Sequence, residues 1–238
     1  MRRTRTTLKV APDAHVPELY FHALNAHFGN LHWWPAESTL EIIIGAVLTQ
    51  NTNWGNVEKA IRNLAERQLI DAHKLLKLPE PELAELIRPS GYFRLKAQRL
   101  RRVLQWYAHH LSQRERPFHG CRTNALRREL LAINGVGPET ADSILLYALR
   151  RPVFVVDSYT RRIMIRHQLL DASADYETMQ NFFRLRLRPS VSQYNQFHAL
   201  IVETGKHFCR PTPRCEKCPL RSFLPAGAST MAGQKPKR

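Results

Sequence analysis

No run of 18 or more apolar residues occurs in this chain of 238 residues, so the sequence contains no candidate for a membrane-spanning helix. The basic start MRRTRTTLKV is followed by APDAHVPELY rather than by an apolar core, which argues against a signal peptide. An amphipathic anchor with flanking aromatic residues is also missing. The sequence therefore predicts a cytoplasmic protein with no membrane partner.

Acidic residues are scarce. Asp and Glu total 20 against 36 Lys and Arg, and the formal net charge is +16. An excess of this size favours a polyanionic partner, because each phosphate contact releases counterions and the charge attracts the partner over a long range. With a membrane surface disfavoured, we expect nucleic acid as the partner and the bacterial nucleoid as the location.

Strand signals are few. The best is PVFVV at residues 152–156, which is short and has no partner of its kind, so we interpret it as a buried extended connector. Most of the remaining chain follows a helical period, and Ser38 and Thr39 form a helix-start signal before the apolar run EIIIGAVL. We predict an all-α fold of roughly ten helices.

One segment, INGVGPETADSILLYAL, has the composition of two helices joined by a glycine hairpin. Gly135 and Gly137 permit a tight turn and a close backbone approach, and Pro138 suits the first turn of the second helix. The exposed N–H groups of that turn form a phosphate-sized anion site, while a plain helix–turn–helix corner with a glycine cap is the alternative. The basic charge of the chain favours contact with a DNA backbone.

A carboxylate, Asp157, lies at the end of the apolar segment VFVV and directly before SYTRRIMIRH. As the N-cap of a helix it accepts backbone N–H bonds, which keep it ionised at neutral pH. From the residues alone, a purely structural cap is the favoured interpretation.

The GVG hairpin, the carboxylate beyond it, the early GAVLTQNT segment and the C-terminal cysteines together resemble the endonuclease III superfamily of DNA glycosylases, over residues 31–219. The resemblance implies a helix–hairpin–helix glycosylase fold, in which two helical domains flank a DNA-binding cleft that receives a flipped-out damaged base. The composition of the two ends predicts flexible tails at 1–17 and 223–238. The resemblance implies a domain formed from 18–39 and 150–222 that carries the cysteine loop, and a six-helix domain at 40–149 that carries the hairpin.

The resemblance also implies roles for individual residues. Asp157 is the catalytic anion, which stabilises the positive charge left on the sugar when the base departs, or activates water. Gln50 enters the gap left by the flipped nucleotide, and Tyr92 wedges into the opposite strand unless it is a loop anchor. The hairpin residues expected to contact DNA are Gly135, Val136, Gly137 and Thr140.

Two departures from the family pattern narrow the activity. Bifunctional members carry a lysine where this chain has Glu139, and a carboxylate cannot form the Schiff base that leads to strand cleavage. The adenine-mismatch branch uses an acid where this chain has Gly45. We therefore expect a monofunctional glycosylase that leaves an abasic site and acts on a base that is already a good leaving group.

Three segments, HWWP, GAVLTQNTNW and RPSGYFRLKAQRL, resemble the 3-methyladenine DNA glycosylases of the endonuclease III type. In those enzymes two aromatic residues sandwich the base, and the matching residues here are Trp34 and Trp54. Indole faces attract a cationic alkylated purine, although these tryptophans can also be ordinary core or rim aromatics. Glu139 is expected to pair with the exocyclic amine or the charge of the base, or else to be a solvated helix residue.

Cysteines are also few, and three of the four are clustered: Cys209, Cys215 and Cys218. In a reducing compartment such a cluster suggests metal or iron–sulfur ligation before disulfides. The family's loop has a fourth cysteine where this chain has Leu224, and three thiolates do not complete a four-cysteine site. A four-iron four-sulfur cluster with another fourth ligand, a zinc site completed by His207, and a loop without metal all stay open.

The leading hypothesis is a monomeric, monofunctional DNA N-glycosylase of base excision repair that removes alkylated purines such as 3-methyladenine from double-stranded DNA. A glycosylase for a deaminated or oxidised base is the alternative within the same class. A non-catalytic helix–hairpin–helix DNA-binding protein and a redox-sensing iron–sulfur protein are the alternatives from other classes.

Overall fold

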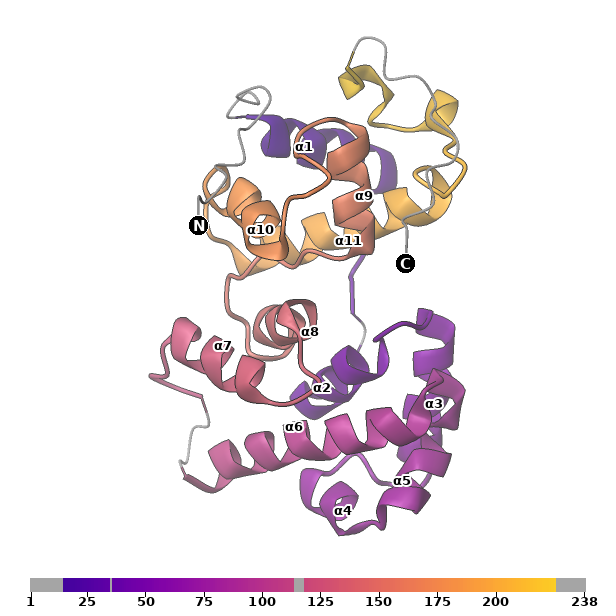
Figure 1. Ribbon diagram of the computed structural model, residues 1–238, viewed down its shortest axis with the longest axis vertical. Helices are drawn as coiled ribbons and strands as arrows, with labels where there is room; N and C mark the ends of the chain where they lie inside the picture. Colours follow the sequence, from indigo (N-terminus) through magenta and orange to yellow (C-terminus); the bar gives the residue numbers. More distant parts are fainter. Residues whose placement is uncertain (1–14, 35, 114–117, 226–238) are drawn as a thin grey trace, which may run out of the picture. The chain divides into compact units, whose positions relative to one another are not determined.

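A computed structural model describes residues 15–34, 36–113 and 118–225, and these ranges are helical without any strand (Figure 1). The α-helices are α1 (Val16–Phe28), α2 (Thr39–Leu48), α3 (Trp54–Glu66), α4 (Ala72–Lys77), α5 (Glu80–Leu86), α6 (Phe93–Gln113), α7 (Thr123–Ala132), α8 (Pro138–Ser143), α9 (Ser158–Arg166), α10 (Tyr176–Arg184) and α11 (Val191–His207). Short 3₁₀ or π segments are η1 (Arg88–Ser90), η2 (Ile144–Ala148), η3 (Cys215–Lys217) and η4 (Arg221–Phe223). The all-α prediction is confirmed. No helix in these ranges is both long and apolar enough to cross a membrane.

The chain divides into two compact units. The terminal unit combines residues 1–33 and 152–238, and the central unit spans residues 34–151. The sequence predicts the central unit at residues 40–149, with its boundaries between 39 and 40 and between 149 and 150. Most of both expected tails lies outside the described residues, but α1 begins at Val16 and η4 ends at Phe223, so helical structure extends into the residues assigned to the tails. Pro17 suits the first turn of α1 and is buried there.

Helix α2 lies at the centre of the central unit. Its N-cap Ser38 accepts a hydrogen bond from the N–H of Glu41 at 3.1 Å, as the sequence predicts. Ile43, Ile44 and Val47 are fully buried, and α2 contacts α3, α6, α8 and η2. Contacts with so many neighbours explain why its sequence is apolar nearly all round.

The described part of the central unit has seven α-helices, α2 to α8, where the family resemblance implied six. Helices α4 and α5 are separate because Pro79 favours an extended conformation for Leu78, which lies between them. Both short helices pack against α6, which also contacts α2. The long helix α6 is therefore the element through which distant parts of this unit are held together.

In the terminal unit, α11 packs against α1 and α9. Phe154 stacks on Phe183 with ring centroids 4.0 Å apart and meets Phe197 of α11 nearly perpendicularly. At Gly205 the backbone of α11 comes so close to the ring of Tyr159 on α9 that any side chain there would collide with it. The start of α9 is thereby fixed relative to α11.

Candidate functional site

The hairpin of the central unit joins α7 to α8 through residues 133–137. The N–H of Val136 donates to the carbonyl of Ile133 at 3.0 Å, which closes a tight turn, and Val136 is buried. Gly135 has φ +93°, a conformation that favours glycine, and Pro138 lies in the first turn of α8. The predicted helix–hairpin–helix is confirmed.

The two glycine positions of the hairpin differ in whether a side chain would fit there. A Cβ at Gly135 would lie 2.6 Å from Cγ of Arg99, so this position leaves room for an arginine of α6. A Cβ at Gly137 would meet nothing within 4 Å, and Gly137 is exposed with φ −90°. The space around residue 137 therefore does not require glycine, and Gly137 is the N-cap of α8, a position that favours this residue.

Gln50, just beyond the end of α2, is bonded to the hairpin. Its Nε2 donates to the carbonyl of Gly135 at 3.1 Å and to Oγ1 of Thr140 at 3.0 Å. Its Oε1 accepts a hydrogen bond from Nη1 of Arg99 at 2.5 Å. Three residues predicted to touch DNA are thus connected directly, and one of them, Thr140, is buried.

The turn that carries Tyr92 is linked to the same region by a buried lysine. Tyr92 is 71% exposed and has φ +45°, between η1 and α6. Lys96 of α6 donates from Nζ to the carbonyl of Ser90 at 2.6 Å and to the carbonyl of Leu48 at 2.7 Å. One amine therefore holds both the Tyr92 turn and the end of α2 that precedes Gln50.

The stability of the protein is expected to depend on pH through Lys96. Burial, with a smaller effect from the charge of Arg99, lowers the pKa of Lys96 to about 8, whereas a lysine in an unfolded chain has a pKa of about 10.4. Between these values the unfolded chain binds more protons than the folded chain, so the free energy of unfolding rises with pH. Below about pH 8 Lys96 is protonated in both the folded and the unfolded chain, so it does not make the free energy of unfolding depend on pH.

The measurement is guanidinium unfolding of the wild type and Lys96→Met across this pH range. The wild type should gain stability relative to the variant above about pH 8, because the tyrosines and other groups that titrate there are common to both proteins. A difference between the two proteins that stays constant with pH would contradict the lowered pKa of Lys96.

A buried ion pair fixes α7 to α8. Asp142 is fully buried, and Arg127 donates to its two oxygens through Nε at 2.7 Å and Nη2 at 3.1 Å. This bidentate geometry compensates the carboxylate charge in a place shielded from water. The ion pair therefore fixes the orientation of α7 relative to α8.

The predicted base-pocket residues Trp34 and Trp54 contact each other. Their ring centroids are 5.1 Å apart with an interplanar angle of 69°, which is an edge-to-face contact. Tyr147 of η2 stacks on Trp34, with centroids 4.7 Å apart and an angle of 27°. A Cβ at Gly45 would come within 3.2 Å of the Trp34 ring, so glycine at this position leaves room for the indole.

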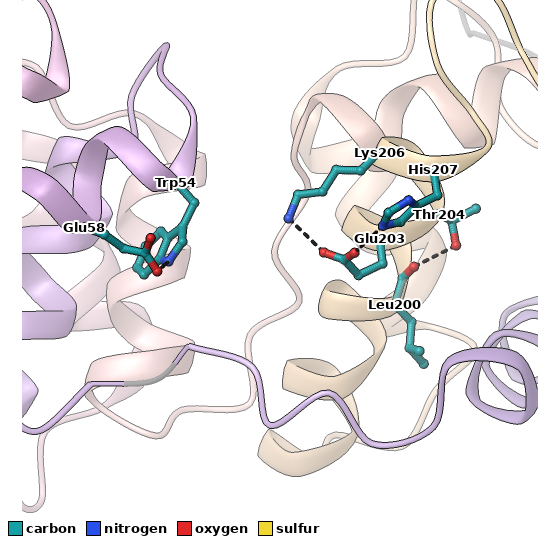
Figure 2. A network of polar contacts seen from close by, with 7 residues as sticks. All are labelled: Trp54, Glu58, Leu200, Glu203, Thr204, Lys206 and His207. Atoms are coloured by element: carbon teal, nitrogen blue, oxygen red, sulfur yellow. Dashed lines mark hydrogen bonds and ion pairs between the residues drawn. The ribbon is translucent and has the colours of Figure 1, made fainter.

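Trp54 is oriented further by Glu58, whose Oε1 accepts a hydrogen bond from the indole Nε1 at 2.7 Å (Figure 2). Glu139, predicted to lie near the pocket, is exposed in the first turn of α8. The central unit thus carries the tryptophans, Glu139, Gln50 and the hairpin.

Asp157 is in the terminal unit and is the N-cap of α9, as predicted. Its Oδ1 accepts hydrogen bonds from the backbone N–H and the hydroxyl of Thr160, at 2.7 and 2.8 Å. Its Oδ2 lies 3.8 Å from Nε2 of His198 on α11, and the Asp157 side chain is 10% exposed. One oxygen is therefore committed to the helix cap, while the other lies toward His198.

The charge of His198 decides what this carboxylate can do. Burial lowers the pKa of His198, and the Asp157 carboxylate opposes that shift only in part. The imidazole is therefore neutral at pH 7 and does not offset a negative charge on Asp157. An anion held in place in this way is suited to stabilising positive charge that develops beside it.

The connector before Asp157 is fixed by α10. The Nε2 of Gln180 donates to the carbonyl of Phe154 at 2.8 Å, and the N–H of Val156 donates to the hydroxyl of Tyr176 at 3.3 Å. Extended backbone here is hydrogen-bonded by side chains rather than by a neighbouring strand. Asp157 consequently has a defined position at the end of the connector.

The loop after α11 holds the predicted metal ligands Cys209, Cys215 and Cys218. Cys209 is buried, and its Sγ accepts a hydrogen bond from Nη1 of Arg166 at 3.3 Å. The alternative ligand His207 bonds through Nε2 to Glu203 at 3.0 Å (Figure 2). In residues 15–34, 36–113 and 118–225, no group of three or more His, Cys, Asp or Glu side chains is arranged to hold a metal ion. The residues present do not fit a four-cysteine cluster, and metal ligation stays a prediction.

Four residues that contact or support the predicted site residues were not singled out from the sequence. Three are in the central unit and one is in the terminal unit: Lys96, Arg99, Tyr147 and His198. For Lys96 a signal was available, since it shares the apolar face of α6 with Leu100 and Val103, four and seven residues on. The helical period therefore places that amine inward. The others have no comparable signal, because their partners are distant in the sequence.

The comparisons with known protein families and with known sequences agree on one family. The profile described as HhH-GPD superfamily base excision DNA repair protein matches residues 44–189. A protein of Methanocaldococcus jannaschii that bears the name of a DNA repair glycosylase is 46% identical over 198 residues, 83% of this chain and 90% of its own. Endonuclease III of Thermotoga maritima is 29% identical over 182 residues, 76% of this chain and 80% of its own.

Solved structures agree with this result. The H. pylori 3-methyladenine DNA glycosylase bound to 1,N6-ethenoadenine superposes with a TM-score of 0.68 and 28% identity, over 82% of this chain and 97% of that chain. A non-covalent complex of endonuclease III with DNA superposes with a TM-score of 0.77 and 19% identity, over 93% of this chain and 99% of that chain. The second likeness shows the fold alone, and both confirm the glycosylase fold predicted from the sequence.

Proposed function

The chain belongs to the HhH-GPD superfamily of base excision DNA repair proteins, and from that premise we propose that it is a monofunctional DNA N-glycosylase for alkylated purines such as 3-methyladenine. The observation that carries the substrate class is the contact of Trp34 with Trp54. Next to Trp34 lies Gly45, so the position that would need an acidic side chain to protonate a neutral base has none. Similarity to the H. pylori 3-methyladenine enzyme supports the same choice.

The proposed chemistry is a hydrolysis that needs no leaving-group acid. The bond between the sugar's anomeric carbon and the base nitrogen breaks, and its electron pair leaves with the base, which is neutralised because it was cationic. Asp157 stabilises the positive charge that remains on the sugar, and its Oδ2 accepts a proton from the water that adds to the anomeric carbon. The products are a free base and an abasic site in an intact strand.

The tryptophan pair must open to accept a base. A flat ring sandwiched between two others needs about 7 Å between them, twice the contact distance of carbon atoms, whereas the ring centroids of Trp34 and Trp54 are 5.1 Å apart. Since Trp34 also stacks on the buried ring of Tyr147, we propose that Trp54, which is half-buried at the start of α3, is the ring that moves.

The absence of strand cleavage is a second part of the proposal. Glu139 stands in the first turn of α8, where bifunctional relatives carry a lysine. A carboxylate cannot form a Schiff base with the sugar, so strand cleavage by this route is closed. The cysteine group, which does not fit a four-cysteine cluster, has no part in these steps. We further propose that the protein acts as a monomer on double-stranded DNA, in the cytoplasm at the nucleoid.

The experiment is a substrate panel of duplexes that contain 3-methyladenine, hypoxanthine, an oxidised pyrimidine or a mismatched adenine. Base release and strand cleavage are measured before and after hot alkali. We expect release of 3-methyladenine, and strand cleavage only after alkali. Release of hypoxanthine or the oxidised pyrimidine alone would support a glycosylase for another lesion, and cleavage without alkali would exclude a monofunctional enzyme.

A further inference from the structure

The sequence analysis gives no role to Arg99 of α6. We propose that Arg99 is a positioning residue, which holds the Gln50 amide against the hairpin so that Gln50 and the hairpin engage DNA as one unit. This inference rests on the proposed function of the central unit as the part that carries Gln50 and the hairpin to DNA.

The hydrogen bonds of Gln50 define the orientation of its amide. The nitrogen donates to the carbonyl of Gly135 at 3.1 Å and to Oγ1 of Thr140 at 3.0 Å, while the oxygen accepts from Nη1 of Arg99 at 2.5 Å. A guanidinium has only donors, so the oxygen of the amide must face it. The carbonyl of Gly135 can only accept, so it keeps the amide nitrogen on the hairpin side, and Arg99 holds the oxygen on the other side; without Arg99 the oxygen would have none of these contacts.

The hairpin is shaped to admit this arginine. A Cβ at Gly135 would lie 2.6 Å from Cγ, 2.7 Å from Nε and 2.8 Å from Cδ of Arg99, so the arginine stem passes directly over the glycine. Gly135 also accepts from Gln50 through its carbonyl. Arg99 therefore touches both members of the unit that it is proposed to hold together.

Helix α6 supports both the backbone and the side chain at this point. Lys96, one turn before Arg99, donates a hydrogen bond to the carbonyl of Leu48 at the end of α2. Arg99 donates to the side chain of Gln50, which follows Leu48 by two residues. The backbone that precedes Gln50 and the Gln50 amide are thus fixed by neighbouring turns of one helix. A flexible glutamine is held in a single orientation before DNA binds, which reduces the conformational entropy lost on binding.

A positioning role differs from that of a cation that only neutralises a phosphate. Arg99→Lys keeps the charge but loses the planar donor group, so a pure charge role predicts near wild-type behaviour. The positioning role predicts that Arg99→Lys and Arg99→Ala each lose about tenfold in affinity for a duplex with a stable abasic-site analogue, the size expected for one charge-assisted hydrogen bond.

The first measurement uses the protein alone. In ¹⁵N spectra the side-chain amide of Gln50 should show a shifted pair of signals with slow hydrogen exchange. Both features should be lost in Arg99→Ala and Arg99→Lys and kept in Arg94→Ala, which removes one exposed arginine from the same helix. Spectra in which the Gln50 signals are the same with and without Arg99 would overturn the contact itself, whatever the protein does to DNA.

The second measurement is a double-mutant cycle with Gln50→Ala, read out as abasic-duplex affinity and single-turnover base release. The effect of Arg99→Ala should vanish in the Gln50→Ala background, while the effect of Arg94→Ala should be the same in both backgrounds. Additive effects of Arg99 and Gln50 in an active enzyme would overturn the proposal. A wild type that neither releases a base nor prefers the abasic duplex would instead overturn the proposed function, and the spectra would still decide the contact.

Discussion

Replacing Asp157 by asparagine is expected to lower the single-turnover rate of base release by about 10²- to 10³-fold, the usual cost of removing one group that stabilises charge in a transition state. Folding should be unaffected, because asparagine is as good an N-cap as aspartate and can keep the bonds from Thr160. Affinity for DNA should hold or rise, since the substitution removes a negative charge from a protein that binds phosphates.

The chain supplies a matched control for this substitution. Asp175 is the N-cap of α10 and accepts a bond from the N–H of Thr178 at 2.8 Å, which repeats the arrangement of Asp157 with Thr160. Asp175→Asn should therefore change neither base release nor stability. Equal activity of Asp157→Asn and the wild type would show that Asp157 is only a cap.

Replacing Arg127 by methionine is expected to lower the free energy of unfolding by about 3 to 5 kcal/mol, the cost of breaking a buried ion pair. The variant takes the bidentate partner from a carboxylate, Asp142, that is fully buried. The melting temperature should fall by roughly 10 °C. Because the pair joins α7 to α8, DNA affinity should fall with it.

The control here is Arg128→Met. Arg128 is the next residue of α7 and is exposed, so this variant loses the same charge without touching Asp142. Its free energy of unfolding should stay within about 0.5 kcal/mol of the wild type. A small loss for Arg127→Met in calorimetry, equal to that of the control, would mean that Asp142 takes up a proton or finds another partner at low cost.

Local features of the fold could be predicted because their causes are local. Ser38 before the apolar run and Asp157 before α9 were predicted as helix caps, and both accept the N–H three residues on. The glycine hairpin followed in the same way from Gly135 and Pro138. In each case the residue that gives the signal and the group that it satisfies lie within one turn of chain.

The polar contacts that hold the site together could not be predicted in this way. Arg99 and Arg127 are charged residues on amphipathic helices, where the pattern favours a solvated face, yet their partners are 49 and 15 residues away. His198 follows Asp157 by 41 residues and meets it only because α9 packs on α11. A helical period indicates which face is buried, but not which distant group is on the other side of the contact.

Trp34 shows a similar limit. The resemblance predicts it as a pocket wall, and that role is untested, but its stacking on Tyr147 and its fit over Gly45 appear only in the folded chain. The cysteine loop differs, since the missing fourth thiol was already visible in the sequence.

The division of the terminal unit between both ends of the chain sets an order of events during synthesis. Helix α1 is made before α9 and α11, but the hydroxyl of its Tyr20 bonds His167, and Leu31, just after the helix, donates its N–H to Gln196. Translation of residues 34–151 at about 5 to 20 residues per second takes roughly 6 to 24 s. Helix α1 lacks its cover by α11 until residues 191–207 have also been made, whereas the sequence of the central unit is complete at residue 151. Nascent chains stalled with residue 151 just outside the ribosome should therefore bind chaperones through α1.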